Sequence, residues 1–197
     1  MPSYDECLVE AELRARAAYG EPQRHYHDER HLDDCLRLLD EVRDLSECER
    51  RTLRWAILWH DAVYDPAASD NEERSADLAE RELRACGVAA ADGAEVARLI
   101  LLTKGHQVHH SDRLGAVLVA IDLSILGSDA GRYREYVAGV RREHAHVPDE
   151  AWRDGRSAVL KRLLGADPIY PNAQFRARLE ESARRNMANE LRALTGG

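Results

Sequence analysis

Two apolar segments of this sequence each contain one carboxylate. The run from Leu53 to Tyr64 contains Asp61 directly after His60, and the run from Ala116 to Leu126 contains Asp122 as its only charged residue. A segment that is apolar on nearly all sides of a helix is expected to be buried. A buried carboxylate is costly unless a partner or a metal ion compensates its charge. We therefore expect compensating groups at both carboxylates, and metal binding is the leading explanation.

Apolar residues recur at helical spacing along the chain, whereas alternating strand patterns are scarce. The sequence predicts an all-α fold, a compact bundle of about eight or nine helices in a single domain over 1–197. Local signals support the helix ends: Ser46 and Glu49 have the spacing of a capping box, and Gly87 stands where a helix should stop. The predicted helices cover 5–19, 27–44, 48–64, 72–86, 92–104, 113–126, 129–145, 148–164 and 172–194.

Charge and hydropathy limit the partners and the compartment. The formal net charge of −8 argues against binding of duplex nucleic acid, because an acidic surface repels the phosphate backbone. The N-terminal residues lack the basic and apolar regions of a signal peptide, and the longest apolar run, Leu114 to Gly127, is too short to span a bilayer. The four cysteines form no CxxC pair, which favours reduced thiols over a disulfide framework. We expect a soluble cytoplasmic protein that binds no membrane. The amphipathic helix predicted over 172–194 is expected to pack on the bundle, and it could support a homodimer.

Two histidines complete a candidate ligand set with the two carboxylates. His31 follows His27 in a histidine-rich segment, and His60 directly precedes Asp61. Imidazole and carboxylate together suit a divalent transition metal, and four protein ligands leave positions open for water and substrate. The alternative is a His–Asp hydrogen-bond network that orders the core without a metal ion.

The order of these residues, His31, then His60-Asp61, then Asp122, resembles the HD phosphohydrolase superfamily of all-α proteins. The resemblance covers roughly 25–170 and is closest to a compact bacterial group of predicted metal-dependent HD hydrolases. The similar segments are Tyr26-His27-x-x-x-His31, His60-Asp61-x-Val63-Tyr64-Asp65, Asn71-Glu72-x-x-Ser75-Ala76, Asp122-Leu123-x-Ile125-Leu126-Gly127 and Gly155-Arg156. The resemblance implies an HD-like bundle in which these four residues hold a divalent ion (Mn, Fe, Co, Ni, Zn or Mg) that activates water against a phosphoester.

Two carboxylates are candidates for a catalytic role beside such an ion. A bound divalent ion lowers the pKa of its water, and a nearby carboxylate can orient that water or move its proton. Asp65 is the first candidate, because in a continuous helix it shares a face with Asp61 at i+4. Glu72 is the second. Both have ordinary explanations, since Asp65 precedes a proline at a predicted helix end and Glu72 suits a helix N-terminus.

Four basic residues are candidates for contacts to a substrate phosphate. Arg24 and His27 precede His31, and His27 lies on the same helical face as His31 if the helix has begun there. Lys104 and His106 open the polar loop before the segment of Asp122. For each residue taken singly, a solvated surface group is the better explanation, and His27 and His106 are the favoured phosphate contacts of the four.

The supply of histidines favours one metal ion. Between Asp61 and Asp122 the only histidines are His106, His109 and His110, all in one loop. Asp61 would be available to bridge if a second ion binds. The predicted function is therefore a metal-dependent phosphohydrolase that cleaves a small phosphate ester, with a nucleotide as the first candidate. The alternatives are a di-iron oxygenase on the same scaffold and an HD module that binds a nucleotide without turnover.

Overall fold

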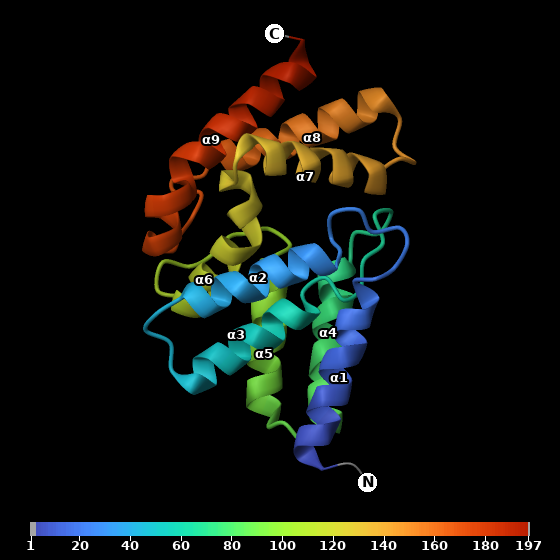
Figure 1. The fold of residues 1–197 in the computed structure, drawn as a ribbon, viewed down its shortest axis with the longest axis vertical. Coiled ribbons are helices and arrows are strands. Elements are labelled where there is room, and N and C mark those ends of the chain that lie inside the picture. The colour runs from blue at the N-terminus through green and yellow to red at the C-terminus, as the bar shows by residue number, and fades with distance from the viewer. Residues whose placement is uncertain (1–2, 197) are drawn as a thin grey trace.

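The chain forms nine α-helices and one 3₁₀ helix in a computed structural model that describes residues 3–196 (Figure 1). No strand occurs within that range, so the predicted all-α bundle of eight or nine helices is confirmed. The elements are α1 (Tyr4–Ala18), α2 (Glu29–Glu41), α3 (Glu47–Trp59), α4 (Asn71–Ala85), α5 (Ala90–Leu102), α6 (Arg113–Asp122), η1 (Leu123–Gly127), α7 (Ala130–Glu143), α8 (Asp149–Leu164) and α9 (Ala173–Thr195).

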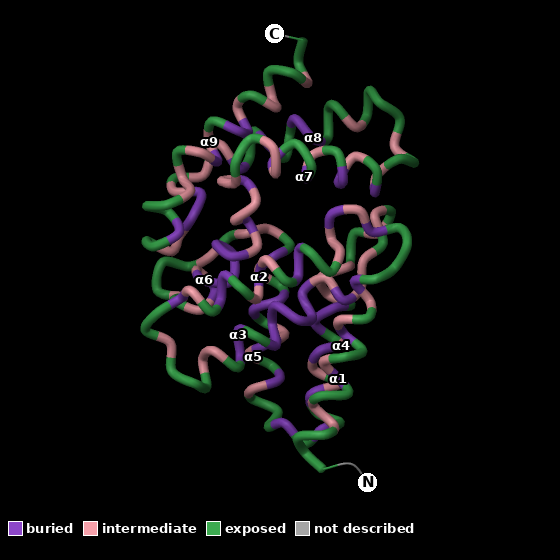
Figure 2. The backbone as a smooth tube through the Cα atoms, viewed as in Figure 1, coloured by how far each residue is buried: buried purple, intermediate pink, exposed green. Residues whose placement is uncertain are grey.

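The helices gather in two groups that meet at η1. Figure 1 shows α1, α4 and α5 extending toward one end of the molecule, with α2 and α3 crossing them, and α7, α8 and α9 together at the other end. Helix α4 packs on α5, α3 packs on α5 and α2, and α9 packs on η1 and α8. The buried residues follow the inner sides of these helices (Figure 2). Trp55 and Trp59 on α3 are only 2% and 1% exposed and anchor the core.

Several helix ends follow from local sequence chemistry. Ser46 and Glu49 form the predicted capping box at the start of α3, and each satisfies a backbone amide of the other. Gly87 follows α4 with a φ of +85°, in the left-handed region that glycine tolerates. Helix α9 begins after Asn172, whose side chain accepts hydrogen bonds from two amides of the first turn.

Helix α3 ends earlier than the sequence predicts. We expected a helix over 48–64, but it stops at Trp59, because remote side chains bond the backbone that follows it. The buried guanidinium of Arg24 donates to the carbonyl oxygens of Asp61 (2.7 Å) and Ala62 (3.3 Å). The hydroxyl of Ser75 then accepts from the amide of Val63 at 3.1 Å. These contacts replace the helical hydrogen bonds.

Helix α7 lies directly on the chain that precedes α2. A Cβ atom on Gly139 would stand 2.6 Å from the carbonyl oxygen of His25 and 3.1 Å from the Cβ of Tyr26, so only glycine permits this approach. Glu143 at the end of α7 secures the same contact. Its Oε1 accepts hydrogen bonds from the backbone amides of His25, Tyr26 and His27 at 2.7, 2.8 and 3.0 Å. The position of α7 therefore depends on one close backbone contact and one buried carboxylate.

The expectation of four reduced thiols is wrong for two of them. Cys7 on α1 and Cys86 after α4 form a disulfide, with Cα atoms 5.4 Å apart. No local pattern predicts this disulfide, because the two residues are separated by 79 positions and meet only where α1 packs beside α4. Cys35 is a buried free thiol and Cys48 an exposed one. Among residues 3–196, no single helix is long and apolar enough to cross a membrane; the segments Arg113–Gly127 and Ala130–Glu143 meet that criterion only as a pair bent by 104°.

Candidate metal centre

The four predicted ligands converge in space. His31 Nε2 and His60 Nε2 lie 3.1 Å apart, and Asp61 Oδ2 is 3.1 Å from the His60 nitrogen and 3.7 Å from that of His31. Asp122 Oδ1 lies 3.5 Å and 3.7 Å from the same two nitrogens. The donor atoms of His31, His60 and Asp122 all lie within 4.8 Å of one another, while Asp61 adjoins the two imidazoles without belonging to that mutual set.

These separations suit neighbouring ligands of one ion. Donors held about 2.0–2.2 Å from a cation and adjacent in its coordination shell are about 2.8–3.6 Å apart. The observed distances of 3.1–3.7 Å fall at or close to this interval. The group His31, His60 and Asp122 could therefore hold a metal ion.

Helix ends place the ligands. His31 occupies the first turn of α2, where the Asp28 side chain caps the amides of Arg30 and His31. His60 directly follows the last residue of α3, and Asp122 is the last residue of α6. Side chains at helix ends can point away from the apolar body of their own helix, so three elements present polar atoms to one point.

The hydrogen bond of His60 Nδ1 indicates which ring nitrogen remains available to bind an ion. His60 Nδ1 lies 2.7 Å from the carbonyl oxygen of Ile57, which can only accept, so Nδ1 carries a proton. This leaves Nε2 as the nitrogen that can bind an ion, the arrangement found in many metal-ligating histidines. The hydroxyl of Tyr19 supports the site from behind, since it accepts from the amide of Asp61 at 3.2 Å and lies 3.4 Å from His60 Nδ1.

The negative charges of the two carboxylates favour a positive charge on the neighbouring groups of the cluster. Burial alone disfavours the charged form of His60, but Asp61 and Asp122 reverse that effect and raise its pKa to about 9. Burial and the neighbouring charge of His60 lower the pKa of His31 to about 4. Burial opposes ionisation of Asp61, yet His60 holds the pKa of Asp61 well below its ordinary value. Without a metal ion, a proton on His60 compensates part of the carboxylate charge. A divalent ion bound at Nε2 would displace this proton and compensate the charge in its place.

The carboxylates are less buried than the sequence indicated. The side chains of Asp61 and Asp122 are 15% and 16% exposed, whereas those of His31 and His60 are 4% and 2% exposed. The apolar runs are buried as expected, but each acid stands at or just past the end of its helix and reaches solvent. Solvent therefore reaches the carboxylate side of the cluster.

His106 adds a third imidazole to the centre. Its Nε2 lies 3.0 Å from Asp122 Oδ2, the oxygen opposite to the one that faces His31 and His60. Its backbone has a φ of +57°, and its Nδ1 is buried with no hydrogen-bond partner in the described part of the chain. Asp122 therefore lies between two imidazoles on one side and a third on the other.

His27 lies beside the cluster, although it precedes α2 and does not share a helical face with His31. The two rings are in edge contact, with centroids 5.9 Å apart. Its Nδ1 lies 2.8 Å from Glu143 Oε2, which also accepts from the Tyr64 hydroxyl at 2.9 Å. Burial lowers the pKa of His27, but the hydrogen bond to Glu143 and the charges of Asp61 and Glu143 outweigh this effect, so the pKa of His27 is raised. Glu143 thus orients an imidazole next to the candidate ligands.

Sequence reasoning missed Glu143. A signal was present, because Glu143 continues the buried stripe of Tyr133, Tyr136 and Val140 on α7. An acid at a core position is the same feature that drew attention to Asp61 and Asp122. It was concealed by the two arginines that precede it in the last turn.

Two of the predicted phosphate contacts, Arg24 and Lys104, form hydrogen bonds within the protein itself. The Arg24 side chain has no exposed surface and donates to Glu21 and to the carbonyl oxygens of His27, Asp61 and Ala62. Lys104 is exposed and bonds the carbonyl oxygen of Ser69 and the Glu73 carboxylate. A phosphate contact from either residue stays a prediction, and Arg24 would have to break this clamp to make one.

The two candidate catalytic carboxylates are not brought to the cluster by any contact in the structure. Because α3 ends at Trp59, the i+4 relation between Asp61 and Asp65 does not apply, and that inference is wrong. Asp65 is exposed, and its Oδ1 accepts from the amide of Ala67 in a turn. Glu72 lies in the first turn of α4, partly buried. Their catalytic roles stay predictions.

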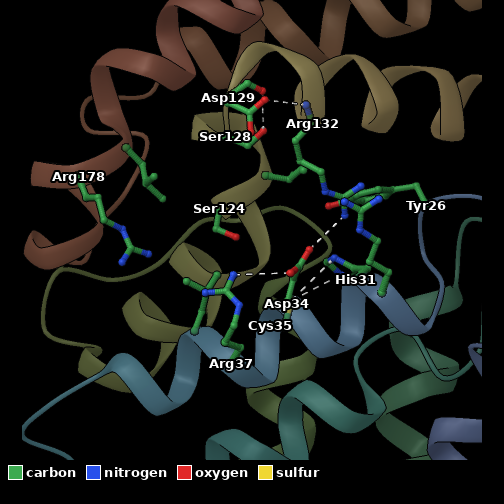
Figure 3. Close-up of a pocket in the computed structure, with 14 residues that line it drawn as sticks. Tyr26, His31, Asp34, Cys35, Arg37, Ser124, Ser128, Asp129, Arg132 and Arg178 are labelled. Atoms are coloured by element: carbon green, nitrogen blue, oxygen red, sulfur yellow. Dashed lines mark hydrogen bonds and ion pairs between the residues drawn. The ribbon is translucent and has the colours of Figure 1, made fainter.

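A cavity of about 350 Å³ lies beside His31 and is lined by residues of α2, η1, α7 and α9 (Figure 3). Figure 3 shows charged side chains of α2, α7 and α9 around it. Its arginines are paired with carboxylates: Arg132 with Asp34 (3.1 Å), Arg37 with Asp34 (3.6 Å), Arg30 with Glu135 (3.0 Å) and Arg178 with Glu41 (2.6 Å). The cavity thus offers room beside a candidate ligand, within a network of ion pairs.

Comparisons of this chain with protein-family models, with curated proteins and with solved structures give no match. The class that the structure itself defines is an all-α protein with a candidate metal centre of imidazoles and carboxylates.

Proposed function

We propose that this protein is a metal-dependent phosphohydrolase of the HD type that cleaves a small phosphate ester, with a nucleotide as the first candidate. The observation that carries the proposal is that the Nε2 atoms of His31 and His60 lie 3.1 Å apart and each lies 3.1–3.7 Å from a carboxylate oxygen of Asp61 and of Asp122. The order of these residues along the chain also supports the proposal, because it resembles the ligand order of the HD phosphohydrolase superfamily. One divalent ion would occupy the centre.

The chain's own residues have distinct tasks in this proposal. When bound, a divalent ion lowers the pKa of its water toward neutrality and polarises a phosphoryl oxygen. His31 and His60 are held in place by the helix cap and by the Ile57 carbonyl, so they require little reorganisation to bind. His27 is 23% exposed and is oriented by Glu143, which leaves its Nε2 free to donate a hydrogen bond or a proton to a phosphate oxygen.

The decisive experiment counts metal before it measures turnover. The protein purified without added metal is analysed for bound elements, and phosphate release is then followed from nucleotides and simple phosphate esters with Mn, Co, Ni, Mg, Zn or Fe(II). We expect close to one divalent ion per chain and hydrolysis that depends on it. Two irons per chain together with oxygen consumption would indicate an oxygenase and refute the proposal. Nucleotide binding without any hydrolysis would indicate a binding module and would also refute it.

Two variants and a matched control separate the site from the fold. Asp122→Asn and His60→Ala should lose metal and hydrolysis together while the circular dichroism of the helices persists. His146→Ala is the control, because His146 is an exposed histidine after the end of α7 whose ring contacts His144 and none of the candidate ligands. Hydrolysis at the wild-type rate by either site variant would refute the assignment.

A further inference from the structure

A second, larger cavity lies on the far side of His106. Its volume is about 720 Å³, within the range of small-molecule sites. The walls are the loop from Gly105 to His110, the end of α8, the segment from Gly165 to Pro171 and the start of α9. We call it the loop cavity.

The loop cavity contains cations without acidic partners. Lys161, Arg162 and Arg176 line it, and none of them forms an ion pair with a carboxylate in the described range 3–196. Asp167 is the only acid among the lining residues. All three cations are exposed, in a chain whose 36 acidic residues outnumber its 28 lysines and arginines. The contrast with the cavity beside His31 is direct, because there the arginines are paired with carboxylates.

Other lining groups extend the capacity for an anion. His109 and His110 stack on one another at the rim, with ring centroids 4.1 Å apart, and both are exposed. One guanidinium nitrogen of Arg162 donates to the carbonyl oxygen of Gly105 at 2.9 Å, which orients the group and leaves its other donors free. A planar guanidinium with free donors can bind a phosphate through two parallel hydrogen bonds.

The base of the loop cavity is apolar. Leu123, Leu163 and Ile169 are 8%, 7% and 4% exposed, and the partly buried Val108 lies with them. A mixture of apolar surface and a few convergent charged groups is typical of sites for organic ligands. An inorganic ion alone would use the cations and leave the apolar base in water.

We propose that the loop cavity binds a small organic anion that carries two or more phosphate groups. Its phosphates contact Lys161, Arg162 and Arg176, and its organic part covers the apolar base. The site stands independently of the proposed phosphohydrolase activity, because binding requires neither a metal ion nor a reaction. His106 is shared with the metal centre, so the bound anion lies one side chain away from Asp122.

The test is calorimetric titration of the full-length protein with inorganic pyrophosphate and with ADP, in buffer freed of divalent ions on a chelating resin. We expect one saturable site that weakens with added salt. Lys161→Gln, Arg162→Gln and Arg176→Gln should each weaken ADP binding by about tenfold, as expected for one charged contact. Arg185→Gln is the matched control on the same helix as Arg176, since Arg185 pairs with Glu181 and lines neither cavity; it should change affinity by less than about twofold.

Lys161→Gln and Arg176→Gln are the most informative variants, because neither side chain forms a hydrogen bond within residues 3–196, whereas Arg162→Gln also removes the bond to the Gly105 carbonyl oxygen. Circular dichroism and thermal unfolding establish that each variant is folded. The proposal is overturned if the wild type shows no saturable binding of either ligand, or if the three variants bind as the wild type does. Because the titration involves no hydrolysis, either result leaves the test of the proposed function separate.

Discussion

Glu143 should make a large contribution to stability that depends on pH. Its side chain has no exposed surface, and it accepts hydrogen bonds from three backbone amides, from Tyr64 and from His27. Burial opposes its ionisation, but the hydrogen bond and charge of His27 and the amides outweigh it and lower the pKa from 4.5 to about 2. Since one pH unit corresponds to about 1.4 kcal/mol, the ionised carboxylate adds roughly 3 kcal/mol to the free energy of unfolding near neutral pH.

The two partners set a pH window. The folded-state pKa of Glu143 lies below its unfolded value, so its contribution is present above about pH 4.5 and is lost as the pH falls toward 2. The folded-state pKa of His27 is raised above 6.5, so its contribution is present below pH 6.5 and is lost as the pH rises through the folded pKa. The pair therefore stabilises the fold most between about pH 4.5 and 6.5.

The assay is urea denaturation of the wild type and of Glu143→Gln at steps between about pH 7.5 and 3. The amide retains one acceptor but turns the other oxygen into a donor that faces the donors of His27 and Tyr64. We expect a loss of roughly 3 kcal/mol near pH 5.5 that shrinks below pH 4. Glu135→Gln is the control on the same helix, because its carboxylate pairs with Arg30 at the surface, and it should cost less than about 1 kcal/mol. A loss below about 1 kcal/mol for Glu143→Gln, or one that grows as the pH falls, would refute the reasoning.

Three further changes test the fold around the site, each by its free energy of unfolding. Gly139→Ala should lower the free energy of unfolding by about 1–2 kcal/mol despite the better helix propensity of alanine, because the new Cβ meets the backbone of His25. In Gly155→Ala on α8 the new Cβ meets nothing within 4 Å, so the free energy of unfolding should rise by up to about 1 kcal/mol. Cys7→Ser should cost about 4 kcal/mol by opening a disulfide that spans 79 positions, whereas Cys48→Ser at an exposed thiol should be neutral. Arg24→Lys keeps the charge but loses the fork that caps the chain after α3, so we expect a loss of roughly 2 kcal/mol. If Arg24→Lys unfolds at the same urea concentration as the wild type, the hydrogen bonds of the Arg24 guanidinium are not needed for stability.

Sequence patterns alone predict the helical class, most helix positions and the four residues of the candidate metal centre. Helix periodicity and caps are local properties, so they can be read from neighbouring residues. The candidate ligands were found for a related reason. A single acid in an apolar run is visible in the sequence, and its cost when buried implies a partner somewhere in the fold.

The surroundings of that candidate centre depend on contacts between segments that lie far apart in the sequence. The end of α3 at Trp59 depends on Arg24, 35 positions earlier, and the orientation of His27 depends on Glu143, 116 positions later. The disulfide, the partial exposure of the two acids and the unpaired cations of the loop cavity likewise arise where remote segments pack. Such features depend on distances between elements, and no local pattern of residues encodes those distances.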